Sequence, residues 1–284
     1  MSLWFWIVCL ITATIAIVGN ATVIFVVLTR EALRSTANVF ISSLAASDLG
    51  VGFWTVPSSY FATQYMTNEK TLEGFDFLHS IFFTASVLNL CLMTVDRYIA
   101  IAFPFKYLAV MTRKRVVSLV SFSWLLAILT SLIPLLWIKG EQEEVEKANS
   151  VFYPTVSLIF VLSSYAILIP ATLHVYLITK RHCHRINAVN LQLKFNHRNL
   201  QIRFRSIDIS SSKLLIMAAI FFIFCYSAQL WQEICDLCKN CSSFPDLTVL
   251  LLLLNSAINP FVYALHKRDI KREFKSILKH CCSS

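Results

Sequence analysis

The chain has 284 residues, of which 57% are hydrophobic and only 14% are charged, and its net charge is +9. Soluble domains usually carry about 25% charged residues, so this composition excludes an ordinary soluble protein. The 5 glycines and 7 prolines leave little room for a turn-rich β architecture. The sequence therefore predicts an all-α protein embedded in a membrane.

Seven apolar stretches follow one another along the chain. Each reaches the roughly 20 residues that a helix needs to cross about 30 Å of hydrocarbon. Lipid offers no partners to backbone N–H and C=O groups, so each stretch is expected to be a helix. The stretches lie at roughly 3–28, 39–65, 75–102, 116–138, 151–179, 213–234 and 245–266.

The basic residues are divided unevenly between the two sets of connecting loops. One set, together with Arg97 and Lys213 at its membrane edges, holds 21 of the 25 lysines and arginines. The positive-inside rule makes this set cytoplasmic and leaves the N-terminus outside. The net positive charge is then an anchoring asymmetry, and no nucleic-acid partner is expected.

Polar motifs inside these stretches carry the functional information. Taken singly each is weak, since an isolated proline within a span can be a plain kink. Together they form an ordered series, each in its own span. In chain order they are Gly19-Asn20, Leu44-Ala45-Ala46-Ser47-Asp48, Asp96-Arg97-Tyr98, Trp124 with Pro134, Pro170, and Asn255-Ser256-Ala257-Ile258-Asn259-Pro260-Phe261-Val262-Tyr263.

In these residues the chain resembles the rhodopsin-like (class A) family of G-protein-coupled receptors, from about Gly19 to Phe274. The resemblance implies a seven-transmembrane helix bundle over residues 1–266. Residues 267–284 are expected to form a short amphipathic eighth helix and a cytoplasmic tail. It also implies a multi-pass plasma-membrane receptor, and no enzyme, that binds an extracellular small molecule or peptide and activates a heterotrimeric G protein.

The resemblance also implies a buried sodium and water pocket. The residues that match its lining are Asp48, Ser86, Asn255, Ser256 and Asn259. A buried carboxylate is costly unless it is paired or coordinates a cation, and hard oxygen donors suit such an ion. Sodium at Asp48 is the one bound metal ion expected, and no other cofactor is. The alternative makes Asp48 a hydrogen-bonded polar core residue.

Arg97 matches the arginine at the centre of the family's activation switch. At rest it would pair with the adjacent Asp96, and also with an acid at the foot of span six, where Asp208 falls. Asp208 could equally be a solvated residue at the start of that helix. The other residues implied in the switch are Tyr98, Tyr226, Asn259, Pro260 and Tyr263.

Two spans depart from the family pattern. Span six reads Cys225-Tyr226-Ser227-Ala228, where the family has Cys-Trp-x-Pro, so the kinking proline is replaced by alanine. Span five has Ile178 where the family usually has tyrosine. Both changes touch the activation machinery, and they favour weak or constitutive signalling as an alternative to ligand-driven activation.

The cysteines also depart from the family pattern. The position at the outer end of span three is Leu72, and loop 139–150 has no cysteine, so the usual disulfide there is absent. Cys235, Cys238 and Cys241 instead lie close together on the outer side. An oxidising exterior favours a disulfide among them, with one thiol left over. Zinc binding is the alternative, but it would need a fourth ligand.

The tail has an apolar stripe and six basic residues, a pattern that suits contact with the bilayer surface. Cys281 and Cys282 follow directly and resemble palmitoylation sites. An unmodified basic tail is the alternative.

The ligand is less well determined than the receptor class. His79 occupies the position of the family's amine-binding aspartate, which disfavours an ordinary monoamine, and the last span has no lysine for retinal. His79 could also be a satisfied polar residue of the bundle. The extracellular side holds ten acids against four bases, which favours cations or basic peptides. The candidate pocket residues are Asp76, His79, Trp54, Ser163, Tyr226, Gln229 and Glu233.

A transporter or channel is the competing class. Transporters usually contain internal repeats or paired broken helices, and the sequence has no internal repeat. The sequence therefore favours the receptor hypothesis over a transporter or channel.

Overall fold

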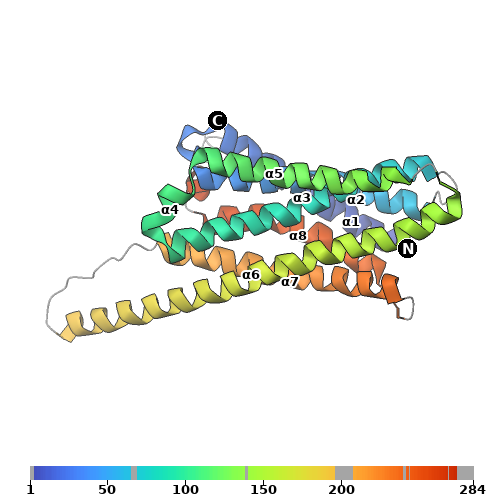
Figure 1. The fold of residues 1–284 in the computed structure, drawn as a ribbon. Helices are drawn as coiled ribbons and strands as arrows, with labels where there is room; N and C mark the ends of the chain where they lie inside the picture. Colours follow the sequence, from blue (N-terminus) through green and yellow to red (C-terminus); the bar gives the residue numbers. More distant parts are fainter. Residues whose placement is uncertain are drawn as a thin grey trace.

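The computed structural model describes residues 3–64, 69–137, 140–195, 207–238, 241–242, 244–267 and 269–273. Within this part of the chain the structure is helical, and Figure 1 shows an elongated bundle of helices running along a common direction. The elements are α1 (Leu3–Thr29), η1 (Glu31–Leu33), α2 (Thr36–Gln64), α3 (Glu69–Ala102), α4 (Pro104–Val110), α5 (Arg113–Leu132), η2 (Ile133–Leu136), α6 (Gln142–Phe195), α7 (Ile207–Cys238) and α8 (Pro245–His266).

Seven of the helices in the described ranges are long and apolar enough to cross a membrane. They are α1, α2, α3, α5, α6, α7 and α8, so the predicted all-α bundle of seven spans is confirmed. Helix α6 is much longer than the apolar stretch at 151–179 that predicted it, and Figure 1 shows it extending beyond the rest of the bundle. Hydropathy detects only the part of a helix that crosses hydrocarbon.

The distribution of side chains is that of a protein in lipid. Large apolar residues such as Phe25, Phe122 and Leu129 are exposed on the outside of the bundle. Polar residues such as Asn20 and Asp48 are fully buried. Hydrocarbon accommodates the exposed apolar side chains at no cost, whereas polar groups must find partners inside the bundle.

Helix α3 lies at the centre and packs against α2, α5, α6 and α7. The main core spans most of the helices and contains Phe40, Leu44, Leu168, Phe222 and Tyr263. One end of the bundle carries the N-terminus and the start of α8, and we call it the N-terminal end. The opposite end carries η1, α4 and the end of α8, and we call it the Arg97 end.

The chain turns after α8, and residues 269–273 are again helical, with Ile270 fully buried. The expected amphipathic helix would continue through Phe274, which lies outside the described residues, as do Cys281 and Cys282. The division at residue 266 and the palmitoylation of the tail therefore stay predictions.

Candidate functional site

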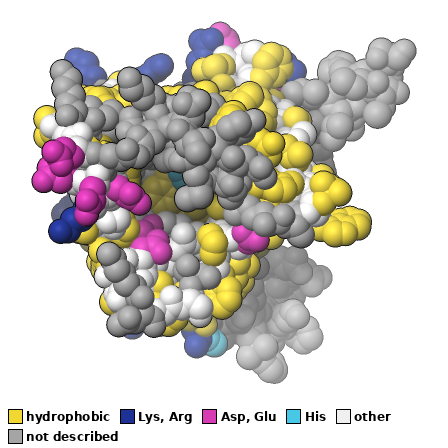
Figure 2. All heavy atoms as spheres, turned by 90° about the vertical axis from the view of Figure 1, so that its right-hand side faces the viewer, with side chains coloured by type: hydrophobic (Ala, Val, Ile, Leu, Met, Phe, Trp, Pro, Cys, Tyr) yellow, Lys and Arg dark blue, Asp and Glu magenta, His cyan; other side chains and the backbone are white. Residues whose placement is uncertain are grey.

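A cavity of about 310 Å³ lies between α3, α6, α7 and α8. Figure 2 looks at the N-terminal end of the molecule, where acidic side chains gather around a hollow with hydrophobic walls. We call this the ligand cavity. Its lining residues are His79, Ser80, Phe83, Thr84, Phe152, Tyr153, Val156, Ser157, Gln229, Glu233 and Leu252.

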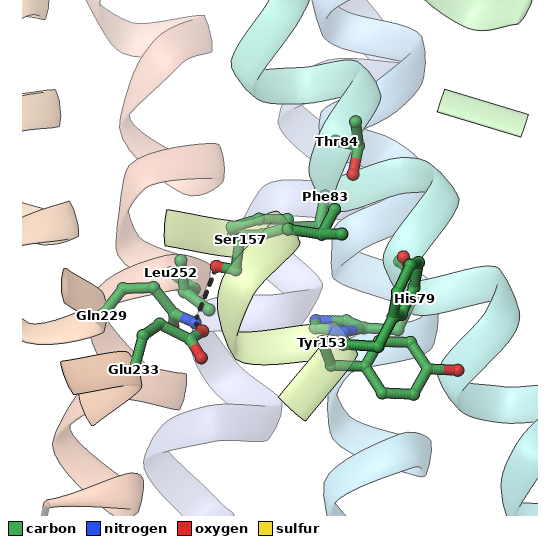
Figure 3. Close-up of a pocket in the computed structure, with 11 residues that line it drawn as sticks. His79, Phe83, Thr84, Tyr153, Ser157, Gln229, Glu233 and Leu252 are labelled. Atoms are coloured by element: carbon green, nitrogen blue, oxygen red, sulfur yellow. Dashed lines mark hydrogen bonds between the residues drawn. The ribbon is translucent and has the colours of Figure 1, made fainter. Parts of the chain in front are cut away.

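The polar groups of the ligand cavity come from opposite walls. Figure 3 shows His79 on α3 facing Gln229 and Glu233 on α7 across the cavity. The Gln229 amide donates to Glu233 Oε1, and its Nε2 also lies 3.4 Å from Ser157 Oγ on α6. The buried Nε2 atom of His79 has no hydrogen-bond partner among the described residues. Three of the predicted pocket residues thus meet in one cavity.

The other predicted pocket residues lie elsewhere. Ser163 is exposed on α6, and its hydroxyl donates to the Phe160 carbonyl of its own helix at 2.9 Å. The rotation of α6 therefore turns Ser163 out of the cavity. Trp54 is not among the lining residues, and the side chain of Asp76 lies outside the described part of the structure.

Tyr226 lies beside the ligand cavity and is buried. Its ring stacks on Phe222 with the centroids 4.1 Å apart, and it lies 5.7 Å from the ring of Phe83, which lines the cavity. Tyr226 therefore contacts a cavity wall on one side and the core of α7 on the other.

Asp48 is fully buried on α2 and is surrounded by neutral donors. Ser86 on α3 donates to its Oδ1 at 2.7 Å, and Ser256 on α8 donates to the same oxygen at 3.0 Å. Asn259 donates to Oδ2 at 2.7 Å. We call these four residues the Asp48 cluster. Asn255 is buried as well, but no hydrogen bond joins it to Asp48 among the described residues.

Pro260 in the last span leaves one carbonyl of α8 without its helical donor, and a residue of α1 supplies the missing hydrogen bond. Pro260 has no N–H, so the Ser256 carbonyl one turn earlier loses its helical donor. Asn20 on α1 donates to that carbonyl at 3.0 Å and to the Ala16 carbonyl at 2.8 Å. A Cβ on Gly19 would lie 2.9 Å from Pro260 Cγ, so the close approach of the two helices requires glycine there. The Gly19-Asn20 motif thus matches the proline motif of α8.

At the Arg97 end, the guanidinium pairs with Asp96, the partner expected from the sequence; that this pair is the resting state of a switch stays a prediction. Arg97 Nη2 donates to Asp96 Oδ2 at 2.6 Å, and Nε donates to the same oxygen at 2.9 Å. Tyr107 on α4 donates to Asp96 Oδ1 at 2.8 Å. The side chain of Asp208 lies outside the described residues. Both oxygens of Asp96 are therefore occupied, and α4 is tied to the foot of α3.

Besides Tyr226, the predicted switch contains Tyr98 and Tyr263, and each of these joins α3 to another helix near this end. The Tyr98 hydroxyl lies 3.1 Å from His174 Nδ1 on α6. The buried Tyr263 hydroxyl lies 3.7 Å from Met93 Sδ on α3.

Two titratable groups at the Arg97 end lie beyond the spans and have shifted pKa values. Burial and the negative charge of Asp96 raise the pKa of the Tyr107 hydroxyl above its usual value, so it remains a donor at neutral pH. Burial lowers the pKa of Lys267 to about 8. Lys267 donates to Asn38 at the start of α2 and pairs with Asp269 at 3.7 Å.

The disulfide expected on the outer side forms between Cys235 at the end of α7 and Cys241, which leaves Cys238 as an exposed free thiol. Two of the three thiols are therefore unavailable as zinc ligands. The sequence could not distinguish this pairing from the others.

Several residues of these sites were missed at the level of sequence. The α6 wall of the ligand cavity, formed by Phe152, Tyr153 and Ser157, lies near the start of a helix whose rotation no motif fixes. Tyr107 had a weak signal, because it follows a helix-initiating Pro104 close behind Arg97.

Known proteins match nearly the whole chain. The model of the 7 transmembrane receptor (rhodopsin family) matches residues 19–263. Adenosine receptor A2a of Cavia porcellus is 25% identical over 95% of this chain and 71% of its own length. Dopamine receptor 1 of Drosophila melanogaster is 27% identical over 95% of this chain and 62% of its own length. Octopamine receptor beta-2R of Chilo suppressalis is 27% identical over 95% of this chain and 78% of its own length.

The family match covers well over half of the chain, and it agrees with the seven spans, the buried polar motifs and the cavity described above. The chain therefore belongs to the rhodopsin family of seven-transmembrane receptors, which are multi-pass plasma-membrane proteins that act through G proteins and are not enzymes.

Proposed function

We propose that this receptor lies with its N-terminus outside the cell and binds an extracellular ligand in the ligand cavity. Its Arg97 end would then activate a heterotrimeric G protein. The observation that carries the proposal is that one face of α3 contributes residues to the ligand cavity, to the Asp48 cluster and to the Arg97 end. The residues on this face lie three, four or seven positions apart, which places them on one side of the helix; they are His79, Phe83, Ser86, Met93 and Arg97.

The contacts along this face form a continuous path. His79 and Phe83 line the ligand cavity, and Phe83 contacts Tyr226 on α7. Ser86 donates to Asp48, and Met93 contacts Tyr263. A ligand that repacks the cavity can therefore bias the positions of α7 and α8 relative to α3, provided that it binds one arrangement better than the other.

The Asp48 cluster is the proposed sodium site. The Asp48 carboxylate is buried among neutral groups, and no basic side chain of the described residues pairs with it. Its oxygens and the hydroxyls of Ser86 and Ser256 are hard donors that suit sodium. The ion would supply the counter-charge that the surrounding helices lack. Asn259 would hold the second carboxylate oxygen.

The Arg97–Asp96 pair is the proposed output switch. In the observed arrangement, both Asp96 oxygens are taken by Arg97 and Tyr107. Releasing the Arg97 guanidinium from Asp96 would free it to contact the G protein as α7 moves outward. This is a two-state element of the kind that ligands bias.

The proposal is tested by G-protein nucleotide exchange on the full chain in lipid nanodiscs. We expect Arg97→Ala to lower receptor-dependent exchange by about 10–100-fold. Arg113→Ala removes an exposed arginine at the same end and should leave exchange within about twofold, since exposed charges contribute little. Equal loss in both variants, or a transport current that survives Arg97→Ala, contradicts the proposal.

The sodium site has a separate test. Asp48→Asn keeps the shape of the side chain and removes its charge. The thermal stability of the wild-type protein should be higher in NaCl than in KCl of equal ionic strength, and this difference should vanish in the variant. A salt response that is the same in both proteins contradicts the sodium site and leaves the ligand cavity untouched.

Signalling without ligand is the second candidate function. The observation that favours it is that α7 runs from Ile207 to Cys238 with Ala228 in place of the family's proline. The exchange assay distinguishes the two candidates, because a constitutive receptor stimulates exchange before any ligand is added.

A further inference from the structure

Glu233 is the most unusual group of the ligand cavity. Only 7% of this residue is exposed, although it lies in the cavity wall. Its neighbours Gln229 and Ser157 are neutral. Within the described residues, no lysine, arginine or histidine lies within ion-pair distance of its carboxylate. A buried carboxyl group in this setting is stabilised either by a cation that pairs with the carboxylate or by a proton that neutralises it.

The surroundings of the cavity favour cations over anions at longer range. Acidic side chains gather around the hollow in Figure 2. On the helices that form the cavity, the exposed acidic residues include Glu143, Glu144 and Glu146 near the start of α6, and Asp236 one turn beyond Glu233 on α7. The exposed Lys147 is the basic residue that accompanies these acids near the start of α6, so negative charge is in excess there. An excess of one sign of charge around a low-dielectric cleft concentrates counter-ions at its mouth. The excess negative charge therefore attracts cations to the cavity that contains Glu233.

The opposite wall of the cavity, formed by α3, supplies a second polar group that can bind the ligand. His79 Nε2 is buried and has no hydrogen-bond partner among the described residues, and His79 faces Glu233 across the cavity. The rings of Phe83, Phe152 and Tyr153 line the space between these walls. Aromatic faces attract organic cations and pack against apolar skeletons. A ligand that fills this space needs a charged group at one end and a hydrogen-bonding group at the other.

We infer that the ligand is a small organic cation whose ammonium group binds Glu233 on α7, and whose second polar group binds His79 on α3 across an aromatic-walled space. This inference rests on the proposed function of the cavity and adds the chemical class of the ligand. The volume of about 310 Å³ lies at the small end of ligand pockets. It fits a small molecule and not a folded peptide. The carboxylate that a cation needs thus comes from α7, on the wall opposite the histidine of α3.

The test uses matched pairs of probes on the purified full-length protein. Each pair is an arylalkyl amine and the alcohol of the same skeleton, beginning with 2-phenylethylamine and 2-phenylethanol and extending to secondary and quaternary amines. A ligand that binds only the folded protein raises its thermal stability. We expect amines, and not the matched alcohols, to stabilise the wild-type receptor at pH 7.4.

Three variants locate the cation site. Glu233→Gln keeps the shape and removes the charge, and it should weaken amine binding by roughly 10–100-fold, the loss expected for a charged hydrogen bond. Glu233→Asp keeps the charge and should retain the preference for amines over alcohols. Asp236→Asn removes a carboxylate of the same helix that does not line the cavity, and it should weaken binding far less than Glu233→Gln.

Four results overturn the inference. The first is equal stabilisation of the wild-type receptor by amines and by the matched alcohols. The second and third are unchanged amine binding in Glu233→Gln, and equal losses of amine binding in Glu233→Gln and Asp236→Asn. The fourth is stabilisation of the receptor by acidification alone with no response to any amine, because the proton would then be the ligand. Nucleotide exchange separates this failure from failure of the proposed function. Amine binding without any exchange contradicts the proposed function alone, whereas exchange without selective amine binding contradicts the inference alone.

Discussion

The contact between Asn20 and the carbonyl that Pro260 leaves without a donor can be tested by a double-mutant cycle. Asn20 is fully buried and donates to the Ser256 carbonyl at 3.0 Å from a different helix. Asn20→Ala removes this donor. In the single variant the carbonyl stays buried, and neither water nor the proline can replace the lost bond.

The expected cost follows from the contacts. Hydrogen bonds between membrane helices contribute about 0.6 kcal/mol on average and up to about 1.7 kcal/mol. A buried carbonyl without a donor costs about 1–3 kcal/mol. Asn20 Oδ1 has no partner among the described residues, so deleting it offsets part of the loss. We therefore expect Asn20→Ala to lower the free energy of unfolding by about 1–2 kcal/mol.

Pro260→Ala supplies the second arm of the cycle. An alanine at 260 has an N–H that can donate to the Ser256 carbonyl within α8. The double variant Asn20→Ala/Pro260→Ala should therefore be more stable than the sum of the single effects predicts, by about 1 kcal/mol.

The free energies are measured by SDS titration of the purified protein in detergent, followed by tryptophan fluorescence. Thr14→Val is the matched control, because Thr14 is an exposed residue of α1 that bonds only to the Leu10 carbonyl of its own helix. Its effect should stay within about 0.5 kcal/mol. Additivity of the two single variants within about 0.5 kcal/mol would refute the reasoning, because independent sites add.

Three further predictions concern the packing of the helices and the Arg97 end. Gly19→Ala should destabilise the bundle by about 1–3 kcal/mol in the same titration, because its Cβ would press on Pro260 and force α1 from α8; no loss of stability would contradict the close approach. Tyr107→Phe should raise ligand-independent nucleotide exchange about two- to tenfold, because Asp96 loses one donor worth about 0.5–1.5 kcal/mol; unchanged basal exchange would mean that α4 does not restrain the switch. Burial lowers the pKa of Lys267 to about 8, so the unfolded chain binds more protons than the folded one between pH 8 and about 10.5. Stability should rise with pH through that window, and the rise should be smaller in Lys267→Met.

The sequence predicted the features that the bilayer enforces. Polar groups in a span must face the interior and find partners there. This is why Asp48, Ser86, Ser256 and Asn259, which lie up to 211 residues apart, meet in one cluster. The seven spans follow from the same constraint. The members of the cluster were predicted from the family resemblance and the spans from hydropathy, and neither prediction needed knowledge of loops or of exact helix rotations.

The features that the sequence did not predict depend on rotation and on loop geometry. Ser163 lies on the exposed face of α6, whereas Ser157 lines the ligand cavity. Six residues separate them, which is not a whole number of turns, and the apolar stretch of α6 does not reveal which one faces inward. Likewise, the spacing of three residues between successive cysteines allowed any pair among Cys235, Cys238 and Cys241.

The length of α3 explains why the ligand cavity and the Arg97 end need intermediate contacts. His79 and Arg97 are eighteen residues apart on one helix, so they are separated by about 27 Å. No ligand in the cavity can touch Arg97 over that distance. Coupling requires elements with two arrangements between them, and the candidates are Tyr226 beside the cavity and the Asp48 cluster below it. Tyr226 joins α3 to α7, and the Asp48 cluster joins α3 to α2 and α8. Because α7 packs against α8, a ligand that moves α7 relative to α3 through Glu233 and His79 also acts on the boundary between α3 and α8 that the Asp48 cluster closes. A variant that loosens this boundary, such as Ser86→Ala, should therefore raise basal exchange and reduce the further effect of an amine. If Ser86→Ala left both quantities unchanged, the Asp48 cluster would not lie on the path between the two ends.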